Sequence, residues 1–282
     1  IYILREAFSQ IDPLAMLWSL GKDSNVMVWL AKKAFFGHVP FPVLHIDTGK
    51  KFPEMYAFRE RYAKEWGLRL LLGDCPPLDE MDATLPPAAR SAARKTGGLK
   101  AKTAELGLKG LIAGIRRDEE GLRAKERVFS PRDVDGKWEL RDQPPEFWEQ
   151  FNTDFPPGTH VRVHPLLAWT ELDIWQYIHR ENIPIVPLYF AAERPVVRRD
   201  GVLVMVDDDR MPLEPGERPE IMRVRFRTLG CYPLTGAVES DAMTVADIIL
   251  ELLASRTSER QGRVIDNDQI GSMEKKKQEG YF

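Results

Sequence analysis

The sequence predicts an α/β protein in which a parallel sheet carries helices on both faces. Four strand-plus-helix units can be identified, each with a short apolar run, a loop and a following helical segment. Strands that alternate with helices favour a parallel sheet covered on both sides. The chain has 282 residues, of which 43% are hydrophobic, so it can bury the core of one large domain.

The first unit contains the most informative loop of the chain. An apolar run at residues 14–18 ends in Ser19-Leu20-Gly21-Lys22-Asp23-Ser24, and an apolar helical face follows. We expect Gly21 to permit a turn that other residues resist. The loop N–H groups and the helix N-terminus would face an anion, Lys22 adds a cation, and the hydroxyls of Ser19 and Ser24 add donors. Phosphate is the natural ligand of such a loop.

Three further units follow in order. They are Pro42–Ile46 before Asp47-Thr48-Gly49, Leu68–Leu72 before a helix around Leu99–Leu106, and Gly110–Ile115 before Arg116-Arg117-Asp118. The carboxyl ends of parallel strands meet at one edge of the sheet, where ligands bind. We therefore expect residues 19–24, 47–49 and 115–118 to share that edge.

The second half of the chain contains weaker signals. Residues 131–158 are loop-like, and His160–Leu166 is a predicted strand before a helix that starts at Thr170 with a capping-box pattern and ends at Pro184. Asp200-Gly201 predicts the turn of a hairpin. We expect an α/β domain over residues 1–195, then this hairpin and a mostly irregular extension over residues 196–282, which would act as a lid or contact a partner.

Two sets of polar residues on the predicted edge are candidates for chemistry. Asp47 and Thr48 suit a nucleotide-bound magnesium ion or a ribose hydroxyl, although Asp-Thr-Gly is also an ordinary turn or helix cap. Arg116 and Arg117, directly after Gly114, suit tetrahedral oxyanions. The alternative for this charged run is a solvated helix face.

The remaining candidates favour structural roles. His45, His164 and His179 lie among apolar neighbours and are expected in the core, as are the aromatic residues Trp169, Trp175, Tyr177 and Tyr189. Cys231 is expected to be structural, although Arg227 could lower the pKa of its thiol. The two cysteines form no disulfide or metal-binding pattern, which favours a reducing, cytoplasmic setting and no metal site.

Bulk properties argue against two classes of partner. The net charge of −3 argues against a nucleic-acid binder held by bulk charge. No segment approaches the roughly 20 apolar residues of a membrane span, and no signal peptide is visible.

The loop pattern S-x-G-x-D-S resembles the pyrophosphate-binding loop of the adenine nucleotide alpha-hydrolase group, whose members split ATP between the α and β phosphates. It is not a Walker A loop, because position 16 is Met. Nearly the whole chain resembles the small, ATP-binding subunit of the two-subunit bacterial sulfate adenylyltransferase. The motifs that carry the resemblance are SLGKDS at Ser19, FPVLHIDTG at Phe41, GIRRDEE at Gly114, RAKERVFS at Arg123, WTELDIWQYI at Trp169, IVPLYFAAERPV at Ile185, RFRTLGCYPLTGAVES at Arg225 and the segment from Thr257 to Phe282.

This resemblance implies an enzyme that converts ATP and sulfate into adenosine 5′-phosphosulfate and pyrophosphate, together with a large GTPase subunit. It implies Mg²⁺ bound with the nucleotide and no redox cofactor. The expected catalytic residues are Lys22, Arg116 and Arg117. The expected nucleotide-binding residues are Ser19, Gly21, Lys22, Asp23, Ser24, Asp47, Thr48 and Gly114.

Three local departures from the family pattern leave the acceptor open: Ile115, Ala168 and the segment Pro86–Lys95. One alternative is a phosphoadenosine-phosphosulfate reductase, which needs a nucleophilic Cys in a Glu-Cys-Gly setting, whereas Cys231 follows Leu229-Gly230. The others are an adenylating enzyme for another acceptor and a nucleotide-sensing adaptor of the GTPase.

Overall fold

A computed structural model describes residues 1–119, 121–133, 137–138, 143, 145–148 and 150–254. Its main sheet has six strands in the order β3-β2-β1-β4-β6-β5. These are β1 (Leu14–Leu17), β2 (Val43–Asp47), β3 (Leu70–Asp74), β4 (Gly110–Ile112), β5 (Phe129–Arg132) and β6 (His160–Val163). All neighbours are parallel except β5, which pairs with β6 in the antiparallel sense. The predicted parallel sheet is confirmed, and β5 is an addition to it.

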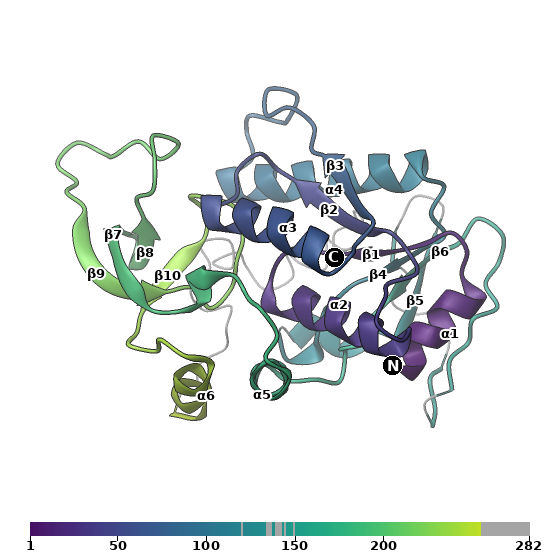
Figure 1. Cartoon of the computed structure of the whole chain (residues 1–282). Helices are drawn as coiled ribbons and strands as arrows, with labels where there is room; N and C mark the ends of the chain where they lie inside the picture. Colours follow the sequence, from purple (N-terminus) through teal and green to yellow (C-terminus); the bar gives the residue numbers. More distant parts are fainter. Residues whose placement is uncertain (120, 134–136, 139–142, 144, 149, 255–282) are drawn as a thin grey trace.

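Helices cover both faces of this sheet (Figure 1). Alternate residues of β1 point to opposite sides: Met16 packs in the large core with residues of α1, α2, α3 and α5, whereas Ala15 packs with Leu99 of α4. These helices are α1 (Tyr2–Gln10), α2 (Lys22–Ala34), α3 (Pro53–Glu65), α4 (Pro87–Glu105) and α5 (Glu171–Glu181).

Two helix boundaries differ from the prediction. The helix expected around Leu99–Leu106 begins at Pro87, and Gly97-Gly98 lies inside it. A Cβ on Gly98 would lie 2.6 Å from the Asp74 carbonyl oxygen, so glycine allows α4 to pack against the end of β3. The predicted capping box of α5 is present, but this helix ends at Glu181 because Asn182 adopts a left-handed cap, before Pro184 is reached.

The region after α5 contains more regular structure than the sequence analysis expected. The short helix η3 (Pro187–Tyr189) precedes the predicted hairpin, which is formed by β7 (Ala192–Arg199) and β8 (Val202–Met205) with Asp200 and Gly201 at positive φ. Strands β9 (Glu220–Arg225) and β10 (Gly236–Glu239) close it into the ring β10-β8-β7-β9, and α6 (Val245–Ala254) follows. The tail from Thr257, part of the predicted lid, lies outside the described residues. No helix in the described part of the chain is both long and apolar enough to cross a membrane.

Candidate active site

The three segments predicted to share one edge of the sheet do so. Strand β1 lies between β2 and β4 and is parallel to both, so the loops after these strands emerge side by side. Gly114, after β4, lies against the start of α2: a Cβ there would be 3.2 Å from Met27 Cγ and 3.3 Å from the Asp23 carbonyl carbon. A small residue at position 114 therefore permits the contact between the two segments.

The loop after β1 turns at a different residue from the one predicted. Leu20 has φ 68°, in the left-handed region, whereas Gly21 has φ −73°. The expected turn role of Gly21 is thus wrong. Glycine instead suits position 21 because it has no side chain. A Cβ there would lie 3.3 Å from Ser19 Oγ and 3.5 Å from the Tyr189 hydroxyl. The Leu20 side chain is fully buried, which offsets the cost of its left-handed backbone.

Hydrogen bonds within the loop order its donors. Ser19 Oγ lies 3.2 Å from Ser24 Oγ, and Ser24 Oγ donates to the Gly21 carbonyl at 2.9 Å. The Lys22 N–H donates to the Tyr189 hydroxyl at 2.9 Å. Tyr189 was expected only as a core residue, and no local sequence signal connects it to a loop 167 positions away. It is a site residue that sequence reasoning missed.

Asp23 connects two buried cations. Lys22, only 1% exposed, places Nζ 3.2 Å from Asp23 Oδ2, and the other carboxylate oxygen pairs with Arg116. Arg116 is fully buried and also donates from Nε to Asp118 Oδ1 at 2.9 Å. Charge-assisted bonds of this kind hold the loop and the end of β4 together.

Arg117 occupies a different environment from Arg116. It is exposed at the start of the 3₁₀-helix η1 (Arg117–Glu119), which η2 (Gly121–Lys125) follows. Its guanidinium donates to the Glu126 carbonyl at 3.1 Å. The two arginines are adjacent in sequence but face different surroundings, one inside the protein and one at the solvent edge of the site.

Asp47 fulfils the turn role that the sequence analysis weighed against nucleotide binding. Its carboxylate accepts from the Gly49 N–H at 2.8 Å and the Tyr56 hydroxyl at 3.0 Å, and pairs with Arg59 at 2.8 Å. Burial alone would raise the pKa of Asp47, but these hydrogen bonds hold it below its ordinary value. Asp47 is therefore an ionised anchor of the loop after β2.

Thr48 and Cys231 meet beside this anchor. Thr48 Oγ1 lies 3.1 Å from Cys231 Sγ, and both residues are buried. Burial would raise the pKa of the Cys231 thiol, but Lys51 and Lys95, with hydrogen bonds from Thr48 and Ser91, lower it to about 6. Arg227 was expected to lower the pKa of Cys231, and this prediction is wrong. Arg227 instead pairs with Glu171 at 2.8 Å.

Two of the three histidines have the expected buried positions. The Nδ1 atoms of His45 and His164 lie 2.8 and 2.9 Å from the carbonyls of Trp18 and Arg127, and burial lowers the pKa of each ring to about 4. Both rings are neutral near pH 7 and bound to the backbone. His179 was expected in the core but is exposed on α5.

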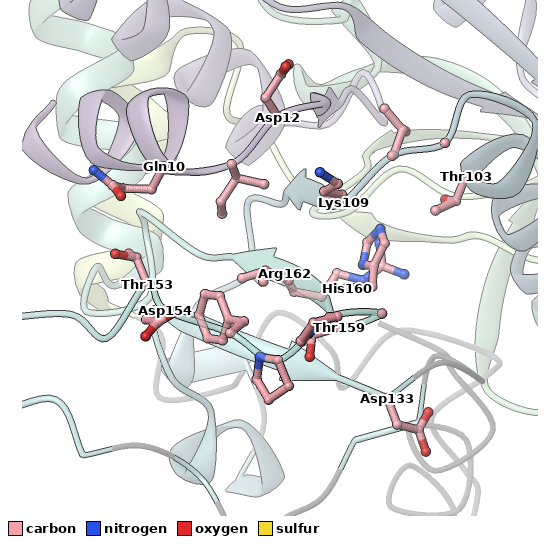
Figure 2. A pocket seen from close by; sticks show the side chains of 18 of the residues that line it. Gln10, Asp12, Thr103, Lys109, Asp133, Thr153, Asp154, Thr159, His160 and Arg162 are labelled. Carbon is pink, nitrogen blue, oxygen red and sulfur yellow. The ribbon is translucent and has the colours of Figure 1, made fainter.

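A cavity of about 1210 Å³ lies at the opposite edge of the sheet, near the amino ends of β1, β4 and β6 (Figure 2). Its lining includes Asp12, Lys109 and His160, which precede or begin those strands. None of the predicted site residues lines this cavity. The loops after β1, β2 and β4 remain the candidate site. The buried cations Lys22 and Arg116 lie there, as does the loop Ser19–Ser24, whose pattern is typical of anion binding.

A parallel sheet with an anion-type loop between its central strand and α2 defines a class of nucleotide-binding α/β proteins. The chain matches the family described as "Phosphoadenosine phosphosulfate reductase domain" over residues 13–237. It is 56% identical to proteins named sulfate adenylyltransferase subunit 2 from Saccharophagus degradans and Citrifermentans bemidjiense, over all of this chain and 94% and 95% of theirs. The protein of that name from Klebsiella pneumoniae is 54% identical over all of this chain and 95% of its own. This chain belongs to the sulfate adenylyltransferase subunit 2 family.

Solved structures align less closely. A phosphoadenylyl-sulfate reductase from Candida auris is 16% identical with a TM-score of 0.47, covering 66% of this chain and 81% of that one. An FMN adenylyltransferase from Candida glabrata in complex with ATP is 15% identical with a TM-score of 0.49, covering 93% and 83%.

Proposed function

We propose that this chain is the catalytic subunit of a sulfate adenylyltransferase, which converts ATP and sulfate into adenosine 5′-phosphosulfate and pyrophosphate. Family membership supports the reaction. The observation that carries the assignment of the site is the Asp23 bridge between Lys22 and Arg116, which places two buried cations at the loop that suits phosphate. A reductase would need a nucleophilic Cys in a Glu-Cys-Gly setting, whereas Cys231 follows Leu229-Gly230.

The proposed chemistry is a direct displacement. A sulfate oxygen attacks the α-phosphorus of ATP, the bond from that phosphorus to the oxygen bridging to the β-phosphate breaks, and pyrophosphate leaves into the loop Ser19–Ser24. Sulfate is fully ionised near neutral pH, so no general base has to remove a proton. The protein then contributes positioning and charge stabilisation. His45 and His164 are neutral and hydrogen-bonded to the backbone, which is consistent with a mechanism that needs no general base.

Each predicted site residue has a part in this scheme. Lys22, Arg116 and Arg117 stabilise charge on the phosphates and on sulfate. Asp23 orients the two buried cations, and Thr48 and Gly114 shape the nucleotide site. Asp47 holds the loop after β2 through its bonds to Gly49, Tyr56 and Arg59. The remaining loop residues, Ser19, Gly21 and Ser24, would hold the leaving pyrophosphate.

Mg²⁺ is proposed to arrive with the nucleotide. In the described part of the chain no group of three or more His, Cys, Asp or Glu residues is placed to hold a metal. The carboxylates of Asp23, Asp47 and Asp118 at this edge are already paired with cations. The residues therefore fit an ion carried on the phosphates, where it would neutralise phosphate charge.

A large GTPase subunit is the proposed partner, and the cytoplasm the proposed location. The name subunit 2 on the close relatives implies a second chain in those proteins, and GTP hydrolysis would drive an uphill adenylyl transfer. The extension at residues 196–282 is proposed to contact this partner or close over the nucleotide.

Pyrophosphate release tests the proposed function. The purified chain, with its GTPase partner and GTP, should release pyrophosphate from ATP only when sulfate is added. Release without sulfate would indicate another acceptor. Sulfite formation from added phosphoadenosine phosphosulfate, dependent on a thiol reductant, would indicate a reductase instead.

A further inference from the structure

Lys51 is a buried cation that the proposed mechanism does not use. It lies in the loop between β2 and α3 and is 5% exposed. Among the described residues its ammonium makes no hydrogen bond and no ion pair. A buried charge without a partner is costly, and burial together with the nearby Lys95 lowers the pKa of Lys51. Such a group is stabilised when an anion binds beside it.

The surroundings of Lys51 are rich in cations and donors. The charged or ionisable groups that act on its ammonium are the carboxylate of Asp47, the ammonium of Lys95 and the thiols of Cys75 and Cys231. Asp47 is already paired with Arg59. The hydroxyls of Thr48 and Ser91 both bond to Cys231, so they lie in the same cluster.

Two segments, the loop after β2 and helix α4, build this cluster at the edge that holds the phosphate loop. Thr48 and Lys51 follow β2, which pairs with β1, whereas Ser91 and Lys95 come from α4. Arg94 of α4 donates to the Thr48 carbonyl at 3.4 Å and to the Pro76 carbonyl at 2.7 Å, which ties α4 to the ends of β2 and β3. The cluster is therefore beside the loop Ser19–Ser24 but separate from it.

We propose that Lys51 and Lys95, with the hydroxyls of Thr48 and Ser91, form the subsite for the acceptor sulfate. Two ammonium groups match the two charges of sulfate, and the hydroxyls can donate to its oxygens. This assignment rests on the proposed function and extends it from the nucleotide to the acceptor. Two other occupants compete for the lysines: the Cys231 thiolate and a phosphate of ATP.

Kinetics of lysine variants separate sulfate from ATP. Lys51→Met and Lys95→Met keep the aliphatic stem but lose the charge, and Lys64→Met, on the exposed side of α3, is the matched control. Loss of a charged hydrogen bond, worth about 1.5–3 kcal/mol, should raise the sulfate KM roughly tenfold to a hundredfold. The Kd for ATP should change less than about twofold, and the control should match the wild type. An unchanged sulfate KM, or an equal loss of ATP affinity, overturns the assignment.

The Cys231 thiol provides a second readout that does not depend on turnover. In a Cys75→Ser background, the thiolate absorbance at 240 nm reports the pKa of Cys231, which is about 6. Sulfate bound beside Lys51 would compete with the thiolate for the same cations, so saturating sulfate should raise this pKa. A pKa that sulfate does not move would show that the thiolate, and not sulfate, is the occupant. If wild-type protein lacks sulfate-dependent pyrophosphate release while sulfate still moves this pKa, the proposed function fails and the subsite stands.

Discussion

Asp23, in the first turn of α2, forms an ion pair with Arg116, a fully buried residue that follows β4. The Asp23 carboxylate also forms an ion pair with Lys22, and Arg116 forms a second ion pair with Asp118. One side chain thus links the loop after β1 to the end of β4. Arg116 has a structural role in addition to any direct effect on the anions.

The two neighbouring arginines should behave differently when removed. Arg116→Ala leaves the Asp23 carboxylate without one of its cations, so unfolding in urea should require about 3 kcal/mol less free energy, with turnover also reduced. Arg117→Ala should leave stability unchanged and lower turnover by roughly 10²–10³, the effect of losing one preorganised donor. Both are measured at saturating ATP. Full turnover in both variants would show that neither arginine stabilises charge on the substrates.

Lys22→Ala should weaken ATP binding and adenylyl transfer together, because the proposed contact is made to the phosphates in both the bound and the reacting state. Equilibrium binding of ATP and single-turnover rates measure the two effects. Lys32→Ala, at the other end of α2, is the control and should behave as the wild type. ATP affinity and rate that survive the loss of Lys22 would refute the phosphate role of this loop.

Acid should destabilise the protein through its buried histidines. His45 is neutral in the fold with a pKa of about 4, below the 6.5 of an unfolded histidine. Between these values the unfolded chain binds a proton that the folded chain does not, so the free energy of unfolding falls as the pH falls. The slope is up to about 1.4 kcal/mol per pH unit for each such histidine.

Urea unfolding from pH 6.5 to 4.5 tests this linkage. His45→Asn retains a donor for the Trp18 carbonyl and removes the titration, so its stability should depend less on pH than that of the wild type. His38→Asn removes an exposed histidine and should keep the wild-type slope. Equal slopes in all three proteins would show that His45 is not the source of acid sensitivity.

Truncation at Ser258 tests the proposed role of the C-terminal extension. The tail is rich in charge and glycine and sparse in apolar residues, a composition suited to closing over a site rather than building a core. The truncated chain should lose ATP turnover or binding to the GTPase subunit. A truncated chain that matches the full one in both assays would leave the tail with no such role.

Local signals were sufficient for much of the fold. The alternation of apolar runs and helical periods predicted the parallel sheet, and the strand order brings residues 19–24, 47–49 and 115–118 to one edge, as predicted. The capping box at Thr170 and the Asp200-Gly201 turn were also predicted, because each is encoded within a few neighbouring residues.

The missed features depend on contacts between distant segments. Gly97-Gly98 looked like a helix boundary because its reason, the close approach to Asp74, is invisible in sequence. Strands β9 and β10 were not predicted, because they pair with other strands only within the closed ring β10-β8-β7-β9. Tyr189 contacts the loop after β1 through packing of separate elements. Burial of the Leu20 side chain, which offsets the cost of its left-handed backbone, is likewise set by tertiary packing.

The central claim is that a sulfate oxygen attacks the α-phosphorus of ATP and pyrophosphate leaves. Sulfate labelled with ¹⁸O on every oxygen tests this directly when the products are analysed by mass spectrometry and ³¹P NMR. We expect all four labels in adenosine 5′-phosphosulfate, one of them in the oxygen that joins phosphorus to sulfur, and none in pyrophosphate. Label in pyrophosphate, or an adenylyl product without sulfate, would contradict the account.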